Sequence, residues 1–241
     1  MGKCISGEAD INKNSPPASK ILCLHGWRTN IEILQFQLSA LRRSLEKDGQ
    51  VDWHLLQSQR PASGPATPDI LAFFGEGTYW EWYDFSSAPS SMNVRKEEST
   101  LEGAESSLRQ IMSYIDKNGP FDAVLGFSQG SSVLGILTAL YYSKKKQKSI
   151  PWRISIHVSG SLVRDTKYGP MLTSMATPIP QKSIFLIGEA DYLTPRTVEL
   201  AKIYEPSLQT IFTHKEGHKF PSPANFNYDQ ITSLLRESEQ V

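Results

Sequence analysis

Length, composition and charge exclude several classes of protein at the outset. The chain has 241 residues, of which 39% are hydrophobic and 21% charged, a composition typical of a folded globular protein and not of a disordered chain or a coiled coil. Lys and Arg (25) balance Asp and Glu (25), so no excess of positive charge is available to bind phosphates, and nucleic acid is not expected as a partner.

The positions of the two cysteines and the hydropathy of the chain indicate the cellular compartment of the protein. Cys4 lies in a polar tail and Cys23 in an apolar run, which argues against a disulfide framework and favours a reducing, cytoplasmic environment. No segment approaches the roughly 18 consecutive apolar residues that a membrane span needs, and the first twenty residues lack the apolar stretch of a secretory signal.

The N-terminal hexapeptide points to a membrane in a different way. Residues 1–6 fit the M-G-x-x-x-[ST] pattern for myristoylation of Gly2, and Cys4 is placed for palmitoylation. Two acyl chains hold a protein stably on a bilayer, so peripheral attachment to the cytoplasmic face of a membrane is expected; the alternative is a chance match. The segment 1–18 is polar and contains proline, and it is interpreted as a flexible leader before one domain over 19–241.

The expected domain opens with a strand, a helix and a second strand. The apolar run 21–24 is typical of a buried parallel strand. Asn30 can cap a helix whose apolar residues recur every three or four positions up to Leu45. Alternating apolar and polar residues over 51–55 then predict the second strand.

A long irregular segment follows the second strand. Residues 58–98 are rich in Pro, Ser and Gly, and a stretch of this length is normally functional, so we interpret it as a lid-like insertion. Ser99 and Glu102 form an S-x-x-E capping box, which predicts the start of a helix that ends at 118.

The rest of the chain continues the alternation of strands and helices. Strands are expected over 122–126 and near 153–158, 183–188 and 208–213, with helices near 129–143, 195–204 and 226–237. Alternation without a fixed repeat predicts an α/β fold: a mainly parallel, doubly wound sheet of about six strands with helices on both faces.

The segment Gly126-Phe127-Ser128-Gln129-Gly130 lies between a predicted strand and an apolar helix. This is the context in which G-x-S-x-G forms a nucleophile elbow, a tight turn that forces the serine toward positive φ. Ser128 is therefore expected at a helix N-terminus, where unpaired N–H groups favour an oxyanion. The alternative is a glycine-flanked turn with an idle serine.

A serine nucleophile needs a histidine base and an acid that orients it, and in this context both follow the serine in the order Asp, His. Asp191 follows the predicted strand 183–188 and is the expected acid, with Glu189 as its competitor. His218 follows the next predicted strand and is the expected base, with His214 as its rival.

The second oxyanion donor of such sites usually comes from the loop after an early strand, beside the N–H of the residue that follows the nucleophile. The oxyanion hole is therefore assigned to the backbone N–H groups of Trp27 and Gln129, and His25 is expected to brace the loop. No metal site is expected.

Four segments resemble the FSH serine hydrolases, a family of small α/β-hydrolases. The resemblance spans residues 20–223 and is most specific over 24–27, 119–130, 187–191 and 216–221. It implies an α/β-hydrolase fold, cleavage of carboxylic esters or thioesters without a cofactor, and a triad of Ser128, Asp191 and His218. The chain departs from the family pattern at Glu216, where relatives often have glycine, and this carboxylate adds negative charge near the base.

Aromatic residues gather in the insertion. Residues 73–85 are dense in Phe, Trp and Tyr, and if they cover the sheet edge, four of them would wall an apolar acyl pocket beside the nucleophile: Phe74, Tyr79, Trp80 and Trp82. The alternative is that they fill the core beneath a long loop.

The sequence thus predicts a cytoplasmic serine carboxylesterase or thioesterase that acts on a small-molecule acyl ester through an acyl-enzyme. Two alternatives stay open. One is a membrane-tethered binder of acyl ligands with little turnover, for example because Glu216 disables the triad. The other is an amide or peptide hydrolase.

Overall fold

The computed structural model describes residues 19–47, 49–84, 100–144 and 150–237. The predicted leader, with Gly2 and Cys4, lies outside the described residues. So does the second part of the predicted insertion, from 85 onward, together with Ser99 of the predicted capping box.

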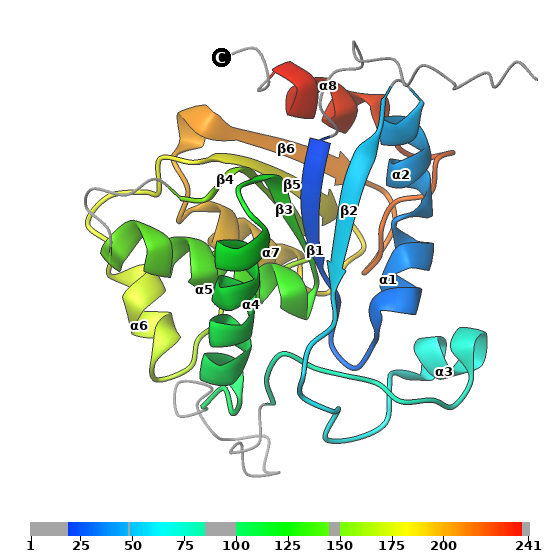
Figure 1. The fold of residues 1–241 in the computed structure, drawn as a ribbon, viewed down its shortest axis with the longest axis horizontal. Helices are drawn as coiled ribbons and strands as arrows, with labels where there is room; N and C mark the ends of the chain where they lie inside the picture. Colours follow the sequence, from blue (N-terminus) through cyan, green and yellow to red (C-terminus); the bar gives the residue numbers. More distant parts are fainter. Residues whose placement is uncertain (1–18, 48, 85–99, 145–149, 238–241) are drawn as a thin grey trace, which may run out of the picture.

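One six-stranded sheet forms the centre of the fold (Figure 1). The strands are β1 Ser19–Leu24, β2 Val51–Leu56, β3 Phe121–Phe127, β4 Trp152–Val158, β5 Lys182–Gly188 and β6 Gln209–His214, in the spatial order β2-β1-β3-β4-β5-β6. Every neighbouring pair is parallel, so all six carboxyl ends meet at one edge of the sheet. The predicted parallel sheet of about six strands is confirmed.

Helices cover both faces of the sheet (Figure 1). They are α1 Ile31–Gln37, α2 Ser39–Glu46, α3 Pro68–Phe74, α4 Ala104–Asn118, α5 Gln129–Lys144, α6 Tyr168–Thr173, α7 Thr194–Ala201 and α8 Asp229–Glu237. Successive strand residues point to opposite faces, so in β1 Leu22 and Leu24 pack with α4, α5 and α7, whereas Ile21 and Cys23 pack with α2 and α8.

Helix α5 is the most deeply buried of the helices that touch the site. Its side chains Val133, Leu134, Ile136 and Leu137 are all buried in the core between the sheet and α4. Each such side chain contributes about 1.5–3 kcal/mol when it leaves water, so the helix that begins directly after Ser128 is firmly fixed.

Several predicted boundaries differ from the observed ones. The predicted helix up to Leu45 is interrupted at Leu38, whose ψ of −6° separates α1 from α2, although Asn30 caps it as expected by accepting from the N–H of Ile33. The helix assigned to the capping box begins only at α4, after Gly103, which has a φ of 85°. Glu102 instead pairs through its backbone with Asp84, so it precedes the helix and is not part of its first turn.

The last predicted helix also begins later than expected. Residues 226–228 precede α8, where the rings of Phe226 and Tyr228 pack edge to face. Helices α3 and α6 have no counterpart in the prediction, because each is a short turn of helix within a proline-containing segment.

Candidate active site

Ser128 lies in a tight turn between β3 and α5. Its φ is 52°, the left-handed conformation expected of a nucleophile elbow, and its N–H donates to the carbonyl of Val158 at 2.9 Å. A Cβ on Gly126 would lie 2.5 Å from the Gly130 backbone, and one on Gly130 would lie 2.4 Å from the carbonyl oxygen of Leu24. Only glycine fits at either position, because strand and helix backbones pass too closely for any side chain.

Three side chains meet at the carboxyl edge of the sheet. His218 Nε2 lies 2.8 Å from Ser128 Oγ. On the other side of the ring, His218 Nδ1 lies 3.0 and 3.1 Å from the two carboxylate oxygens of Asp191. A ring that donates Nδ1–H to the carboxylate leaves Nε2 free to accept the serine proton, which is the tautomer a general base needs.

The environment of Asp191 keeps its carboxylate charged. The side chain is 1% exposed, and burial alone would raise its pKa. Hydrogen bonds from His218 and from the N–H of Leu193, the latter at 2.8 Å, outweigh burial and hold the pKa of Asp191 below its usual value. At neutral pH the carboxylate is therefore ionised and can stabilise an imidazolium.

The two rival residues do not join this cluster. Glu189 pairs with Lys215 Nζ at 2.8 Å and is half exposed. His214 is buried, neither of its ring nitrogens has a hydrogen-bond partner among the described residues, and burial lowers its pKa. The geometry brings Asp191 and His218 to Ser128, and leaves Glu189 and His214 apart from it.

The loop after β1 lies beside the elbow. A Cβ on Gly26 would lie 3.6 Å from Ser128 Cβ, so the Gly26 backbone lies beside Ser128, and Trp27 is the next residue along the chain. In the part of the chain that the structure describes, the backbone N–H groups of Trp27 and Gln129 donate to no carbonyl or side chain. Both N–H groups are thus free to donate to a substrate oxygen.

His25 holds that loop in place. Its Nδ1 lies 2.8 Å from the carbonyl oxygen of Gly26, and its Nε2 lies 3.2 Å from the N–H of Ser58. Burial lowers the pKa of His25 to about 4, so the ring is neutral, with Nδ1 as donor and Nε2 as acceptor. The ring ties the loop after β1 to the loop after β2.

Similarity to known proteins identifies the family of this chain. The family model described as "Serine hydrolase (FSH1)" matches residues 15–229. The chain belongs to this serine hydrolase family. Esterase C25G4.2 of Caenorhabditis elegans is 25% identical over 227 residues, covering 93% of this chain and 96% of that protein. Esterase OVCA2 of Bos taurus is 29% identical over 221 residues, covering 86% of this chain and 92% of that protein.

Solved structures agree on the fold. A carboxylesterase from Mesorhizobium loti matches with a TM-score of 0.57 at 13% identity, covering 92% of this chain and 90% of that one. Acyl-protein thioesterase 2 of Zea mays matches with a TM-score of 0.57 at 17% identity, covering 93% and 95%. The predicted α/β-hydrolase fold of this serine hydrolase is therefore confirmed.

The insertion is anchored to the elbow by the side chain of Gln129. Gln129 Oε1 accepts from the N–H of Trp82, and Gln129 Nε2 donates to the carbonyl of Tyr83, both at 2.7 Å. Trp82 also donates its Nε1–H to the carbonyl of His25 at 2.8 Å. Sequence reasoning assigned only the backbone of Gln129 and missed its side chain, since nothing local shows which distant backbone a glutamine will bind.

The aromatic residues proposed as a pocket wall divide into two groups. Trp82 is 0% exposed and Tyr79 is buried against Ile33, so neither offers surface to a substrate in this structure. Phe74 and Trp80 keep exposed surface, and Phe74 packs edge to face on Phe36. The burial of Trp82 and Tyr79 therefore favours the alternative interpretation, in which these residues fill the core beneath a long loop, over a place in the pocket wall.

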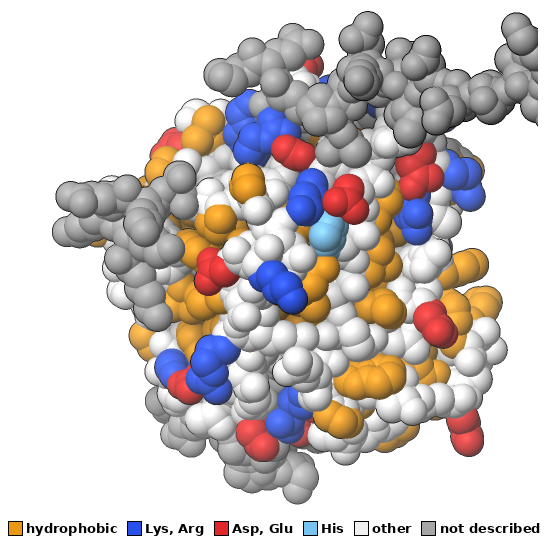
Figure 2. All heavy atoms as spheres, viewed as in Figure 1, with side chains coloured by type: hydrophobic (Ala, Val, Ile, Leu, Met, Phe, Trp, Pro, Cys, Tyr) orange, Lys and Arg blue, Asp and Glu red, His pale blue; other side chains and the backbone are white. Residues whose placement is uncertain are grey.

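Hydrophobic side chains remain exposed over α1 and α3, as Figure 2 shows. Elsewhere in the segment after β2, the buried carboxylate of Glu81 lies between two arginines: Arg28 Nε is 3.4 Å and Arg60 Nε 3.3 Å from its oxygens. A glutamate within an aromatic run was the signal that could have indicated this role.

Glu216 does not face the imidazole. Its carboxylate accepts from the N–H of Ser222 at 3.0 Å, from the Ser222 hydroxyl at 2.6 Å and from Asn225 Nδ2 at 2.7 Å. Burial would raise the pKa of Glu216, but these hydrogen bonds lower it to about 2. The residue that departs from the family pattern therefore shapes the loop that carries His218, which weakens the hypothesis that it disables the base.

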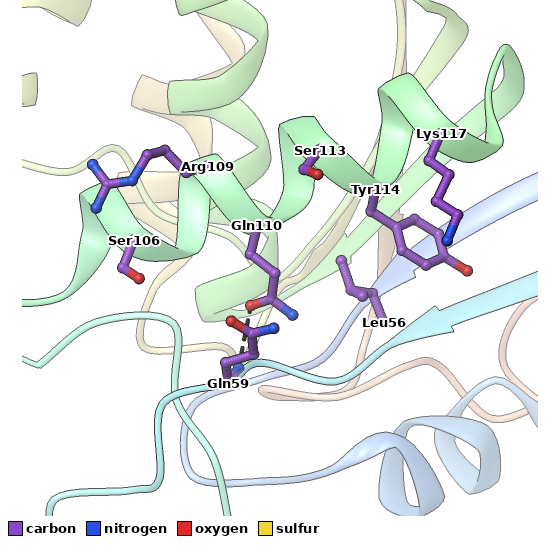
Figure 3. Close-up of a pocket in the computed structure, with 8 residues that line it drawn as sticks. All are labelled: Leu56, Gln59, Ser106, Arg109, Gln110, Ser113, Tyr114 and Lys117. Carbon is purple, nitrogen blue, oxygen red and sulfur yellow. Dashed lines mark hydrogen bonds between the residues drawn. The ribbon is translucent and has the colours of Figure 1, made fainter.

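A polar groove lies on α4 (Figure 3), and none of Ser128, Asp191 and His218 lines it. Its lining comes from the end of β2, the loop after it and α4, and Gln59 N–H donates to Gln110 Oε1 across it at 3.2 Å. Among the described residues no group of three or more His, Cys, Asp or Glu side chains could hold a metal ion.

Proposed function

We propose that this serine hydrolase cleaves carboxylic esters or thioesters with an apolar acyl group through an acyl-enzyme on Ser128. The observation that carries the proposal is the arrangement around one ring: His218 Nε2 lies 2.8 Å from Ser128 Oγ, while Nδ1 contacts both oxygens of Asp191. The names of the relatives, esterases among them, support an ester substrate.

The proposed reaction has two halves. Ser128 Oγ attacks the acyl carbon as His218 Nε2 takes its proton, and the N–H groups of Trp27 and Gln129 hold the oxyanion. His218 then gives the proton to the leaving oxygen or sulfur as that bond breaks. Water then attacks the acyl carbon as His218 takes its proton, and His218 returns that proton to Ser128 Oγ as the acyl–serine bond breaks and the acid leaves. Asp191 stays ionised throughout and stabilises the imidazolium.

We further propose that Trp80 and Phe74 wall the acyl site. The backbone of Trp80 pairs with Thr29 in both directions, at 2.8 and 3.2 Å, and Thr29 Oγ1 donates to the carbonyl of Gly26. Trp80 is therefore tied to the loop that carries the proposed oxyanion donor, where an acyl chain would leave the reacting carbon.

Matched substrates test this function. We expect the wild-type protein to turn over oxoesters and thioesters of the same acid many times, with rates that depend on acyl length from acetyl to palmitoyl, and to cleave the corresponding anilides far more slowly. Tight retention of a fatty acid without turnover would support the acyl-ligand binder instead. Equal rates on esters and anilides would support the amide hydrolase.

We also propose that Gly2 is myristoylated and Cys4 palmitoylated. The support is residues 1–6 alone. Within the described ranges, no helix is both long and apolar enough to cross a bilayer. In this proposal the acyl chains attach the protein to the cytoplasmic face of a membrane.

Fractionation of cells that can myristoylate the protein checks this anchor. Gly2→Ala is expected to move the protein from the membrane pellet to the supernatant, because both acyl chains are lost when palmitoylation depends on prior membrane contact. Cys4→Ser, which keeps one chain, should give intermediate fractionation. An unchanged pellet fraction for Gly2→Ala would refute acylation as the anchor.

A further inference from the structure

Tyr192 is an exposed aromatic residue in direct contact with the proposed base. Its ring centroid lies 5.1 Å from that of His218, with an angle of 39° between the planes, yet 77% of the residue is exposed. Phe127 contacts the same imidazole at 5.4 Å but is buried. The imidazole therefore has one aromatic neighbour on the protein side and a second, Tyr192, on the solvent side.

The loop that carries Tyr192 is fixed at both of its ends. The N–H of Leu193 donates to Asp191 Oδ1 at 2.8 Å, and the N–H of Thr194 donates to the carbonyl of Asp191 at 3.0 Å. The Tyr192 hydroxyl has no hydrogen-bond partner in the ranges that the structure describes. These hydrogen bonds fix the backbone of the loop, and the contact with His218 places the Tyr192 ring beside the imidazole.

The acylation step determines which part of a substrate lies beside the Tyr192 ring. In acylation, His218 Nε2 takes the proton from Ser128 Oγ and gives it to the leaving oxygen or sulfur as the bond to the acyl carbon breaks. The leaving atom must therefore come within hydrogen-bond distance of His218. In the proposed reaction the carbonyl oxygen of the substrate points instead toward the N–H groups of Trp27 and Gln129. A substrate group that lies next to the imidazole is therefore part of the alcohol or thiol.

We propose that Tyr192 forms the leaving-group subsite and selects esters or thioesters whose alcohol or thiol carries an apolar or aromatic group near the reacting atom. This inference rests on the proposed function. Offset aromatic contacts of this kind are favourable beyond the area they bury. No part of the acyl group needs to touch Tyr192.

The two halves of the reaction separate this role from a merely structural one. The leaving group has departed before the acyl-enzyme is hydrolysed, so a leaving-group contact changes acylation and leaves deacylation unchanged. A side chain that only positions His218 would change both, because the same imidazole acts in each half.

Pre-steady-state kinetics on acetate esters of ethanol, butanol, benzyl alcohol and 4-nitrophenol provide the test. Tyr192→Ala is expected to lower the acylation rate about tenfold for benzyl acetate relative to ethyl acetate, with deacylation unchanged. Tyr192→Phe should retain the wild-type preference. Phe73→Ala is the matched control, because it removes an aromatic side chain that is 85% exposed and, among the residues that the structure describes, stacks on no other ring.

Two results would overturn the proposal. One is an unchanged preference among the alcohols in Tyr192→Ala. The other is an equal fall in acylation and deacylation for every ester, which would make Tyr192 a positioning residue for His218. Failure of the proposed function looks different: the wild-type protein would then show no acylation with any of the esters.

Discussion

Asp191→Asn is expected to lower kcat about 10⁴-fold while the protein stays folded. The carboxylate accepts Nδ1–H of His218 through both oxygens and so fixes the tautomer in which Nε2 can accept the serine proton. An asparagine presents N–H groups to the same nitrogen, which favours a ring with its proton on Nε2, where it cannot act as a base. The loss of negative charge also removes the stabilisation of the imidazolium.

Steady-state hydrolysis of a nitrophenyl ester measures this effect, with circular dichroism to check the fold. Glu189→Gln is the matched control, because this neighbouring carboxylate forms an exposed pair with Lys215 and should change kcat less than about twofold. A severe loss in Glu189→Gln together with near-normal activity in Asp191→Asn would show that the acid has been assigned to the wrong residue.

Gly130→Ala is expected to destabilise the fold by about 3 kcal/mol. Alanine is the better helix former by up to ~1 kcal/mol, which would favour the variant at the start of α5. The added Cβ, however, would lie 2.4 Å from the carbonyl oxygen of Leu24 and 2.6 Å from that of His25. Both contacts are with backbone at the end of β1, which cannot rotate away, so the steric cost exceeds the gain in helix propensity.

Thermal unfolding should show a fall in Tm of roughly 10 °C for Gly130→Ala. Displacement of the end of β1 would also move Trp27 relative to Ser128, so activity should fall as well. Gly49→Ala is the control, since a Cβ at that position meets nothing within 4 Å. If Gly130→Ala unfolded at the wild-type temperature and kept full activity, the close approach of β1 and α5 would be wrong.

The parts of the site that sequence reasoning located are those with local signals. Ser128 is marked by its flanking glycines and by its place between a predicted strand and an apolar helix. Asp191 follows the buried strand β5 and His218 follows the edge strand β6, and parallel strands place such loops at one edge of the sheet. The topology therefore converts three separate local patterns into one cluster.

The features that were missed or misplaced depend on contacts between distant segments. The N-terminus of α4 could not be read from Glu102, because pairing with Asp84 competes with the capping box. The burial of Trp82 depends on the side chain of Gln129 and the carbonyl of His25, which lie far from it in the sequence. An aromatic run has the same composition whether it lines a pocket or supports the backbone around one.

Covalent capture of the nucleophile tests the central claim most directly. A fluorophosphonate transfers its phosphonyl group to an activated serine with loss of fluoride, and the site of the adduct is read by mass spectrometry of the digested protein. We expect one adduct per chain, on the peptide that contains Ser128, and none on folded Ser128→Ala. An adduct on another residue, or equal labelling of Ser128→Ala, would contradict the assignment of Ser128 as the nucleophile.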